Sequence, residues 1–143
     1  MKIVPITAAG GVLFRQGAGE TEVLLIFRRG VWDLPKGKLE GEESIVECAQ
    51  REVSEEVGAP WPEVTAKLTK TYHEYEEDGR QIGKTTHWYA MQIPRDHELK
   101  PEGDEGITKL EWMPISAAIE NVGFENLRDV LTVLEGHLQD RDV

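Results

Sequence analysis

Residues 37–59 read GKLEGEESIVECAQREVSEEVGA and contain the clearest local pattern in this chain of 143 residues. Ser44 and Glu47 form a capping box, in which the serine hydroxyl accepts a hydrogen bond from the backbone of residue 47 and the glutamate reaches back to the backbone of residue 44. Apolar residues then recur at spacings of three and four along one stripe, namely Val46, Ala49, Val53 and Val57. Gly58 follows as a stop signal. The pattern predicts a helix over residues 44–57.

Three glutamates occupy the face of this helix that lies away from the apolar stripe. Glu52, Glu55 and Glu56 are spaced i, i+3 and i+4, so their carboxylates project from neighbouring positions. Like charges this close repel one another unless cations lie among them, and Mg²⁺ and Mn²⁺ prefer such oxygen ligands. The chain holds 27 acidic residues, however, and a run of glutamates on a helix is usually only a solvated surface. The spacing of the three glutamates alone therefore does not distinguish a metal site from a solvated surface, and the residues around them must decide.

Those residues form a longer pattern with fixed spacing. It consists of Gly37, five residues, Glu43, seven residues, Arg51-Glu52-Val53, one residue, Glu55-Glu56, one residue, and then Gly58-Ala59. This pattern resembles the signature of the Nudix hydrolase family at every charged and glycine position. It departs only at Ala59, where a bulkier aliphatic residue is usual, and the departure affects packing rather than chemistry.

The resemblance implies a fold and a reaction. The implied fold is of the α/β (α+β) class, a Nudix-type α/β/α sandwich with a mixed β-sheet between helices. The implied reaction is metal-dependent hydrolysis of a phosphate anhydride, with water attacking phosphorus. In the family, the three glutamates bind divalent ions, here expected to be Mg²⁺ or Mn²⁺, and the first glycine of the motif, here Gly37, offers its carbonyl oxygen as a ligand.

The residue that takes the proton from the attacking water varies between family members. Glu52 is the first choice, and Glu105, in the loop over residues 102–106, is the second choice and a further metal ligand. An ordinary solvated loop acid is an equal interpretation of Glu105. Arg51 and Glu43 are expected to pair and to hold the loop against the helix, which is a structural role.

A second set of residues resembles a polyphosphate site. The stretch 32–37, with Lys36 before the first motif glycine, is similar to that of diadenosine tetraphosphate hydrolases and diphosphoinositol polyphosphate phosphohydrolases, where this lysine contacts substrate phosphate. Tyr75 stands sixteen positions beyond the motif, where diadenosine polyphosphate hydrolases tend to carry tyrosine. Arg28, Lys84 and Phe124 complete the candidate substrate site as two phosphate contacts and a stacking ring. Arg29 would add charge beside Arg28, although arginines that flank a turn are more often structural or solvated.

The remaining sequence predicts the other elements. β-Favouring residues and alternation predict strands over residues 6–14, 22–28, 64–75, 84–93 and 107–113. Proline and glycine predict a loop over residues 32–38, and helical periodicity predicts helices over residues 115–122 and 125–137. Strands with helices before and after them favour stacked layers around one core. The length favours a single domain over residues 1–143.

Composition disfavours several classes of partner. The net charge is −11 and the lysines and arginines are scattered, so nucleic acid and anionic membrane surfaces should be repelled. The longest apolar runs are far shorter than the roughly 20 residues of a membrane span. A single cysteine, Cys48, and an N-terminus without a signal-peptide pattern favour a cytoplasmic protein, as a monomer or homodimer. The expected partner is a small nucleotide or polyphosphate substrate.

Several functions share this metal helix. The best interpretation is hydrolysis of a dinucleoside polyphosphate, diadenosine tetraphosphate giving ATP and AMP. A nucleotide-pool sanitising hydrolase of oxidised guanine nucleotides, a diphosphoinositol polyphosphate phosphohydrolase and an RNA 5′-end pyrophosphohydrolase are alternatives. RNA is disfavoured by the acidity of the chain, and inositol pyrophosphates by the scarcity of clustered cations. A non-catalytic nucleotide-sensing module is an alternative of another class, disfavoured because every motif acid is present.

Overall fold

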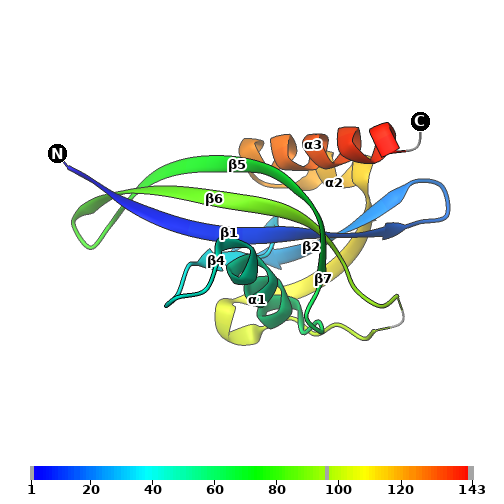
Figure 1. Cartoon of the computed structure of the whole chain (residues 1–143), viewed down its shortest axis with the longest axis horizontal. Helices are drawn as coiled ribbons and strands as arrows, with labels where there is room; N and C mark the ends of the chain where they lie inside the picture. The colour runs from blue at the N-terminus through cyan, green and yellow to red at the C-terminus, as the bar shows by residue number, and fades with distance from the viewer. Residues whose placement is uncertain (1, 96, 142–143) are drawn as a thin grey trace.

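The computed structural model describes residues 2–95 and 97–141. Runs of strands are separated by a helix and followed by further helices, and these elements stack in layers (Figure 1). The strands are β1 (Ile3–Gln16), β2 (Thr21–Arg28), β3 (Val31–Asp33), β4 (Lys36–Lys38), β5 (Glu63–Glu77), β6 (Arg80–Gln92) and β7 (Ile107–Pro114). The helices are α1 (Ile45–Val57), α2 (Ile115–Asn121) and α3 (Glu125–Arg141), with a short 3₁₀ turn, η1 (Gly103–Glu105), before β7. None of the helices in the described ranges is both long and apolar enough to cross a membrane.

The sheet is mixed, as predicted. Its strand order is β3-β2-β1-β6-β5, with β4 also paired to β1 and β7 to β2. β1 and β6 run parallel over eleven residue pairs, while the other pairings are antiparallel. The middle of β1, residues 8–10, lies between β4 and β6, and its last residues, 14–16, pair with β2. The long strand β1 therefore joins the two parts of the sheet.

Helices cover both faces of the sheet, which confirms the α/β/α layers (Figure 1). Alternate residues of β1 point to opposite faces, so Leu13 packs towards α1 and Val12 packs towards α2 and α3. Each face has its own buried cluster of aliphatic residues. The ends of β5 and β6 and the start of β1 extend past α1 and α3, at the left of Figure 1. This extension forms one side of the cleft described below.

The helix α1 begins and ends where the sequence predicts. The Ser44 side chain accepts a hydrogen bond from the backbone of Glu47, and the Glu47 carboxylate accepts one from the backbone of Ser44, at 3.1 and 2.9 Å. Gly58 ends the helix with φ of 66°, in the left-handed region. Cys48 is fully buried on the packed face, as expected of a small helix residue.

The predicted loop over residues 32–38 is wrong in part. Residues 31–33 form β3 on β2, and residues 36–38 form β4 on β1, so only residues 34 and 35 interrupt the pairing. Proline and glycine in this segment favoured the prediction of a loop. Pairing with strands distant in the sequence instead gives it extended structure.

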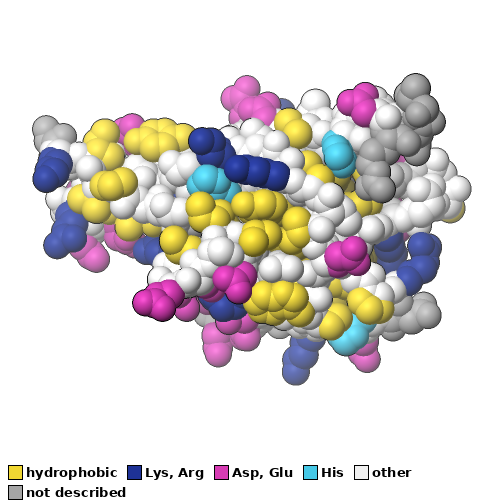
Figure 2. All heavy atoms as spheres, viewed as in Figure 1, with side chains coloured by type: hydrophobic (Ala, Val, Ile, Leu, Met, Phe, Trp, Pro, Cys, Tyr) yellow, Lys and Arg dark blue, Asp and Glu magenta, His cyan; other side chains and the backbone are white. Residues whose placement is uncertain are grey.

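Charged side chains are spread widely over the face drawn in Figure 2. Lysine and arginine side chains occur singly or in pairs at several separate places on it, and no continuous basic stripe runs across this face. On this face the lysine and arginine side chains are therefore scattered, as they are along the sequence.

Candidate metal and substrate site

The three motif glutamates project from the second half of α1 with very different exposure. The Glu56 side chain is 2% exposed, Glu52 12% and Glu55 58%. A helix brings positions i, i+3 and i+4 together, so the three side chains are neighbours. The burial of these side chains increases from the outer Glu55 to the inner Glu56. The cluster therefore runs from solvent into the interior.

Gly37 lies on β4 directly against Glu52. A Cβ atom at Gly37 would overlap the Glu52 carboxyl group, so only glycine leaves room for that carboxylate. The Sγ atom of Cys48 lies 3.6 Å from the Gly37 carbonyl oxygen, and burial raises the pKa of this thiol to about 12. The thiol is therefore a packed neutral group beside the candidate ligand Gly37.

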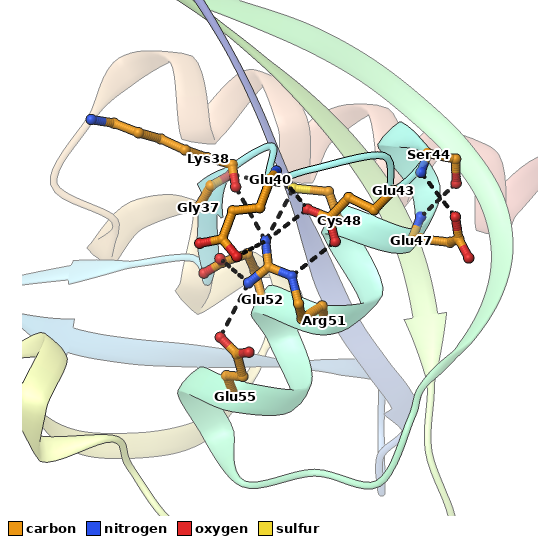
Figure 3. A network of polar contacts seen from close by, with 10 residues as sticks. All are labelled: Gly37, Lys38, Glu40, Glu43, Ser44, Glu47, Cys48, Arg51, Glu52 and Glu55. Carbon is orange, nitrogen blue, oxygen red and sulfur yellow. Dashed lines mark hydrogen bonds and ion pairs between the residues drawn. The ribbon is translucent and has the colours of Figure 1, made fainter.

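Arg51 joins the loop to the helix, as the sequence predicts (Figure 3). Its guanidinium donates to Glu43 at 2.9 and 2.8 Å and to the Lys38 carbonyl oxygen at 3.2 Å. These bonds lower the pKa of Glu43 to about 2 and raise the pKa of Arg51. The same guanidinium also contacts Glu52 at 2.7 Å and Glu55 at 3.2 Å, which the sequence analysis did not foresee.

The arrangement bears on whether a divalent ion fits. Within residues 2–95 and 97–141, no three acidic, histidine or cysteine side chains converge closely enough to hold a metal ion. Arg51 accounts for this absence, because its guanidinium contacts Glu52 and Glu55 where a metal ion would otherwise lie. The Glu56 Oε1 atom is buried and has no hydrogen-bond partner. An all-oxygen donor set with one orphaned carboxylate oxygen suits a hard cation such as Mg²⁺ or Mn²⁺. The residues present therefore fit such an ion, and Glu52, Glu55, Glu56 and the Gly37 carbonyl oxygen would hold it.

The buried carboxyl of Glu56 has an unusual protonation equilibrium. Burial raises its pKa to about 8, the neighbouring Glu52 adds to the rise, and the cations Arg28 and Lys36 oppose it. The nearest of these is Arg28, whose Nη1 atom lies 3.7 Å from Oε1. Burial likewise raises the pKa of Glu52, and Arg51 opposes that rise. Burial therefore favours the protonated form of Glu56 when no metal ion is bound.

This protonation predicts that the metal-free protein loses stability as pH rises. The folded-state pKa of about 8 lies above the ordinary value of 4.5, so the stabilisation is complete below about pH 4.5 and is lost as pH rises through about 8. We expect a loss of roughly 2 to 4 kcal/mol between about pH 5 and pH 9. Urea unfolding in EDTA should show the loss, and Glu56→Gln should remove it. An identical pH dependence in that variant would contradict the assignment.

A cleft of about 310 Å³ opens between the β2–β3 turn, the start of α3 and the extended part of β5 and β6. All five residues predicted to bind substrate line it: Arg28, Lys36, Tyr75, Lys84 and Phe124. Arg28 also contacts Glu56, so the cleft leads to the glutamate cluster. The structure thus brings together residues that lie up to 96 positions apart, between 28 and 124.

Aromatic and cationic side chains alternate along the β5–β6 side of the cleft. The ring of Tyr75 stacks on His73 with centroids 5.5 Å apart, and the ammonium of Lys84 lies 5.1 Å from the Tyr75 ring centroid. Phe124, just before α3, also lines the cleft and is 46% exposed. Trp88 is buried and donates from Nε1 to Thr71 at 2.9 Å. His73 lines the cleft as well, and the sequence analysis did not select it.

Asp33 is a cleft residue that the sequence analysis missed. It is buried, and its Oδ1 atom accepts a hydrogen bond from the backbone of Leu34 at 2.7 Å. Its Oδ2 atom lies 3.3 Å from Arg28 and 3.8 Å from Lys36, so it positions both cations. No spacing in the sequence distinguishes Asp33 from a solvated loop acid.

Glu105 stands apart from the other predicted ligands. It ends η1 as an exposed residue, and within the described residues its side chain makes no hydrogen bond or ion pair. Its loop is tied to the end of α1, because the backbone of Glu102 donates to the Glu56 carbonyl oxygen at 3.0 Å. The structure places the loop beside the metal helix without bringing the Glu105 carboxylate into contact with the cluster.

Comparison with known proteins identifies the family. A NUDIX domain matches residues 5–132, so the chain belongs to the NUDIX domain family, as the motif predicted. The chain is 32% identical over 143 residues to the mutator protein MutT4 of Mycobacterium tuberculosis (strain CDC 1551 / Oshkosh), covering 94% of this chain and 56% of that protein. It is 31% identical over 146 residues to an 8-oxo-(d)GTP phosphatase of Mycolicibacterium smegmatis (strain ATCC 700084 / mc(2)155), covering 88% of this chain and 40% of that protein. This chain therefore spans about half the length of these relatives.

A solved structure agrees with the fold. The binary complex of an Ap4A hydrolase from C. elegans superposes with a TM-score of 0.76 at 21% identity, covering 94% of this chain and 98% of that chain. At this identity the likeness concerns the fold alone. It confirms the expected α/β/α architecture with a mixed sheet.

Proposed function

We propose that this chain is a Mg²⁺- or Mn²⁺-dependent hydrolase that cleaves a phosphate anhydride in a nucleotide substrate. The observation that carries the proposal is the joining of two sites by Arg28, which contacts both the glutamate cluster and the cationic cleft. In a chain of net charge −11, the cations gathered in the cleft favour an anionic ligand there. The acids beside them favour divalent ions at the same place.

The residues divide the work as follows. Ions held by Glu52, Glu55, Glu56 and the Gly37 carbonyl oxygen would neutralise phosphate oxygens and acidify water. Glu52, on the side of the cluster nearer solvent than Glu56, is the proposed acceptor of the water proton, with Glu105 as the second candidate. The deeper Glu56 serves as a ligand.

The cleft residues hold the substrate. Lys36 and Arg28 are held by Asp33 with their charges directed along the cleft, and they would bind phosphate oxygens next to the scissile bond. Lys84 would bind a phosphate further out. Tyr75 and Phe124, which both line the cleft, would each stack on a base.

Two aromatic rings in one cleft favour a substrate with two nucleosides, so the proposed substrate is a dinucleoside polyphosphate such as diadenosine tetraphosphate. The relative named as an 8-oxo-(d)GTP phosphatase supports a second candidate, a hydrolase of oxidised guanine nucleotides, at 31% identity. A sensing module without catalysis is less favoured, because all the motif acids are present and Glu52, Glu55 and Glu56 lie on one helix.

The test is hydrolysis of a substrate panel by the purified protein with Mg²⁺. The panel contains diadenosine tetraphosphate, 8-oxo-dGTP, ADP-ribose and a diphosphoinositol polyphosphate, with products separated by ion-exchange chromatography. We expect ATP and AMP from diadenosine tetraphosphate, at the highest kcat/KM of the panel. A preference for 8-oxo-dGTP would select the second candidate, and binding without turnover of any compound would support the sensing module.

A further inference from the structure

Two hairpins of this chain use the same two-residue turn. The β2–β3 turn is flanked by the pair Arg28 and Val31, and the β5–β6 turn by the pair Glu77 and Arg80. The central φ angles of the first turn are 55° at Arg29 and 78° at Gly30, and those of the second are 52° at Asp78 and 75° at Gly79. Positive φ at both central residues is the geometry of a type I′ turn.

The two turns differ at the first central position. Type I′ turns favour Asn, Asp or Gly there, because these residues adopt the left-handed region at little cost. Asp78 follows this preference, whereas Arg29 does not. A long side chain in the left-handed region is strained, and such strain is retained mainly at functional sites. The same fold thus provides an unstrained turn away from the cleft and a strained one beside it.

The strained residue lines the substrate cleft. Arg29 is exposed at the cleft rim, next to the deeper Arg28. The charges of Arg28 and Lys36 are already engaged by Asp33, and Lys84 faces the Tyr75 ring. Within residues 2–95 and 97–141, Arg29 makes no side-chain hydrogen bond or ion pair. Its positive charge also contributes to a lowered pKa of Lys84, which indicates that the two cations are near each other. Arg29 is therefore an unengaged cation at the outer end of the cleft.

We propose that Arg29 determines specificity for the length of the phosphate chain. Inner phosphates are bound by Arg28 and Lys36, and Arg29 contacts phosphate groups that reach the rim only in longer chains. The strain of the β2–β3 turn is the cost of holding a cation at this position. The proposal rests on the proposed polyphosphate function, but it makes a separate statement about affinity and stability.

The test measures binding of inorganic pyrophosphate and inorganic tetraphosphate by calorimetry. The protein is loaded with Ca²⁺, another hard oxygen-binding cation, in place of Mg²⁺ to slow turnover. In Arg29→Asn we expect tetraphosphate to bind about five- to tenfold more weakly, and pyrophosphate to change by less than about twofold. The same variant should unfold about 2 to 5 °C higher, because asparagine suits the turn. Arg29→Lys keeps the charge and should bind both pyrophosphate and tetraphosphate with wild-type affinity.

The second hairpin supplies the matched control. Asp78→Arg places arginine in the equivalent turn outside the cleft, so it should lower the unfolding temperature and leave both affinities unchanged. Equal losses for the two phosphates in Arg29→Asn, or no loss, would overturn the specificity role. A lower unfolding temperature in Arg29→Asn would overturn the strain argument. If the nucleotide panel is not hydrolysed while the tetraphosphate loss is seen, the proposed function fails and this inference stands.

Discussion

Glu56→Gln and Glu55→Gln should each lower kcat for the best substrate of the panel by about 10³-fold or more. Each change removes one carboxylate ligand from the proposed ion site, and the deeper position loses the orphaned oxygen that an ion would engage. Calorimetry should show that Mg²⁺ binding weakens in parallel with activity. The fold should persist, because Glu55 is 58% exposed and glutamine resembles the protonated form that burial favours at Glu56.

The matched control for these variants is Glu120→Gln. Glu120 is an exposed glutamate on α2, outside the cluster and the cleft. It should change neither kcat nor Mg²⁺ affinity. Wild-type activity in both cluster variants would contradict the metal site and the proposed function with it. Loss of activity with unchanged Mg²⁺ binding would move these glutamates from ligands to other catalytic roles.

Gly37→Ala should lower kcat by about 10²-fold or more while the protein remains folded. The added Cβ would overlap the Glu52 carboxyl group, and Gly37 cannot retreat because it pairs with Ala9 across β4 and β1. Arg51 holds Glu52 at 2.7 Å, so the carboxylate must leave this contact to make room. We expect a loss of about 1 to 3 kcal/mol in the free energy of unfolding.

Gly19→Ala is the matched control for that change, since a Cβ at Gly19 meets no neighbouring atom. It should leave stability and kcat unchanged. Shortening the opposing side chain by combining Gly37→Ala with Glu52→Asp should recover part of the lost stability without recovering kcat, because a proton acceptor that is displaced stays ineffective. Full activity in Gly37→Ala would show that Glu52 does not need this position.

The helix α1 was predictable in detail, whereas for the cleft only its members were predictable and not their arrangement. The capping box, the apolar stripe and the glutamate spacing of α1 all follow from contacts within a few residues, and the structure confirms each. Lys36, Tyr75 and Lys84 came from the resemblance to a family, Arg28 and Phe124 were selected for their charge and ring, and all five line one cavity in the structure. No sequence pattern singled out Asp33, since its burial arises from Arg28 and from the folding of β3 onto β2.

Local rules therefore determined what the sequence alone could determine: the helix with its caps, the alternation of the long strands and the family to which the chain belongs. The tertiary structure decided the rest, including the pairing of β4 with β1 that presses Gly37 on Glu52, and the bridging of Glu43, Glu52 and Glu55 by Arg51. The physical reason is the separation along the chain between the residues that interact. Capping bonds and helical spacing act between near neighbours, whereas strand register and buried ion pairs depend on segments that meet only when the whole chain folds.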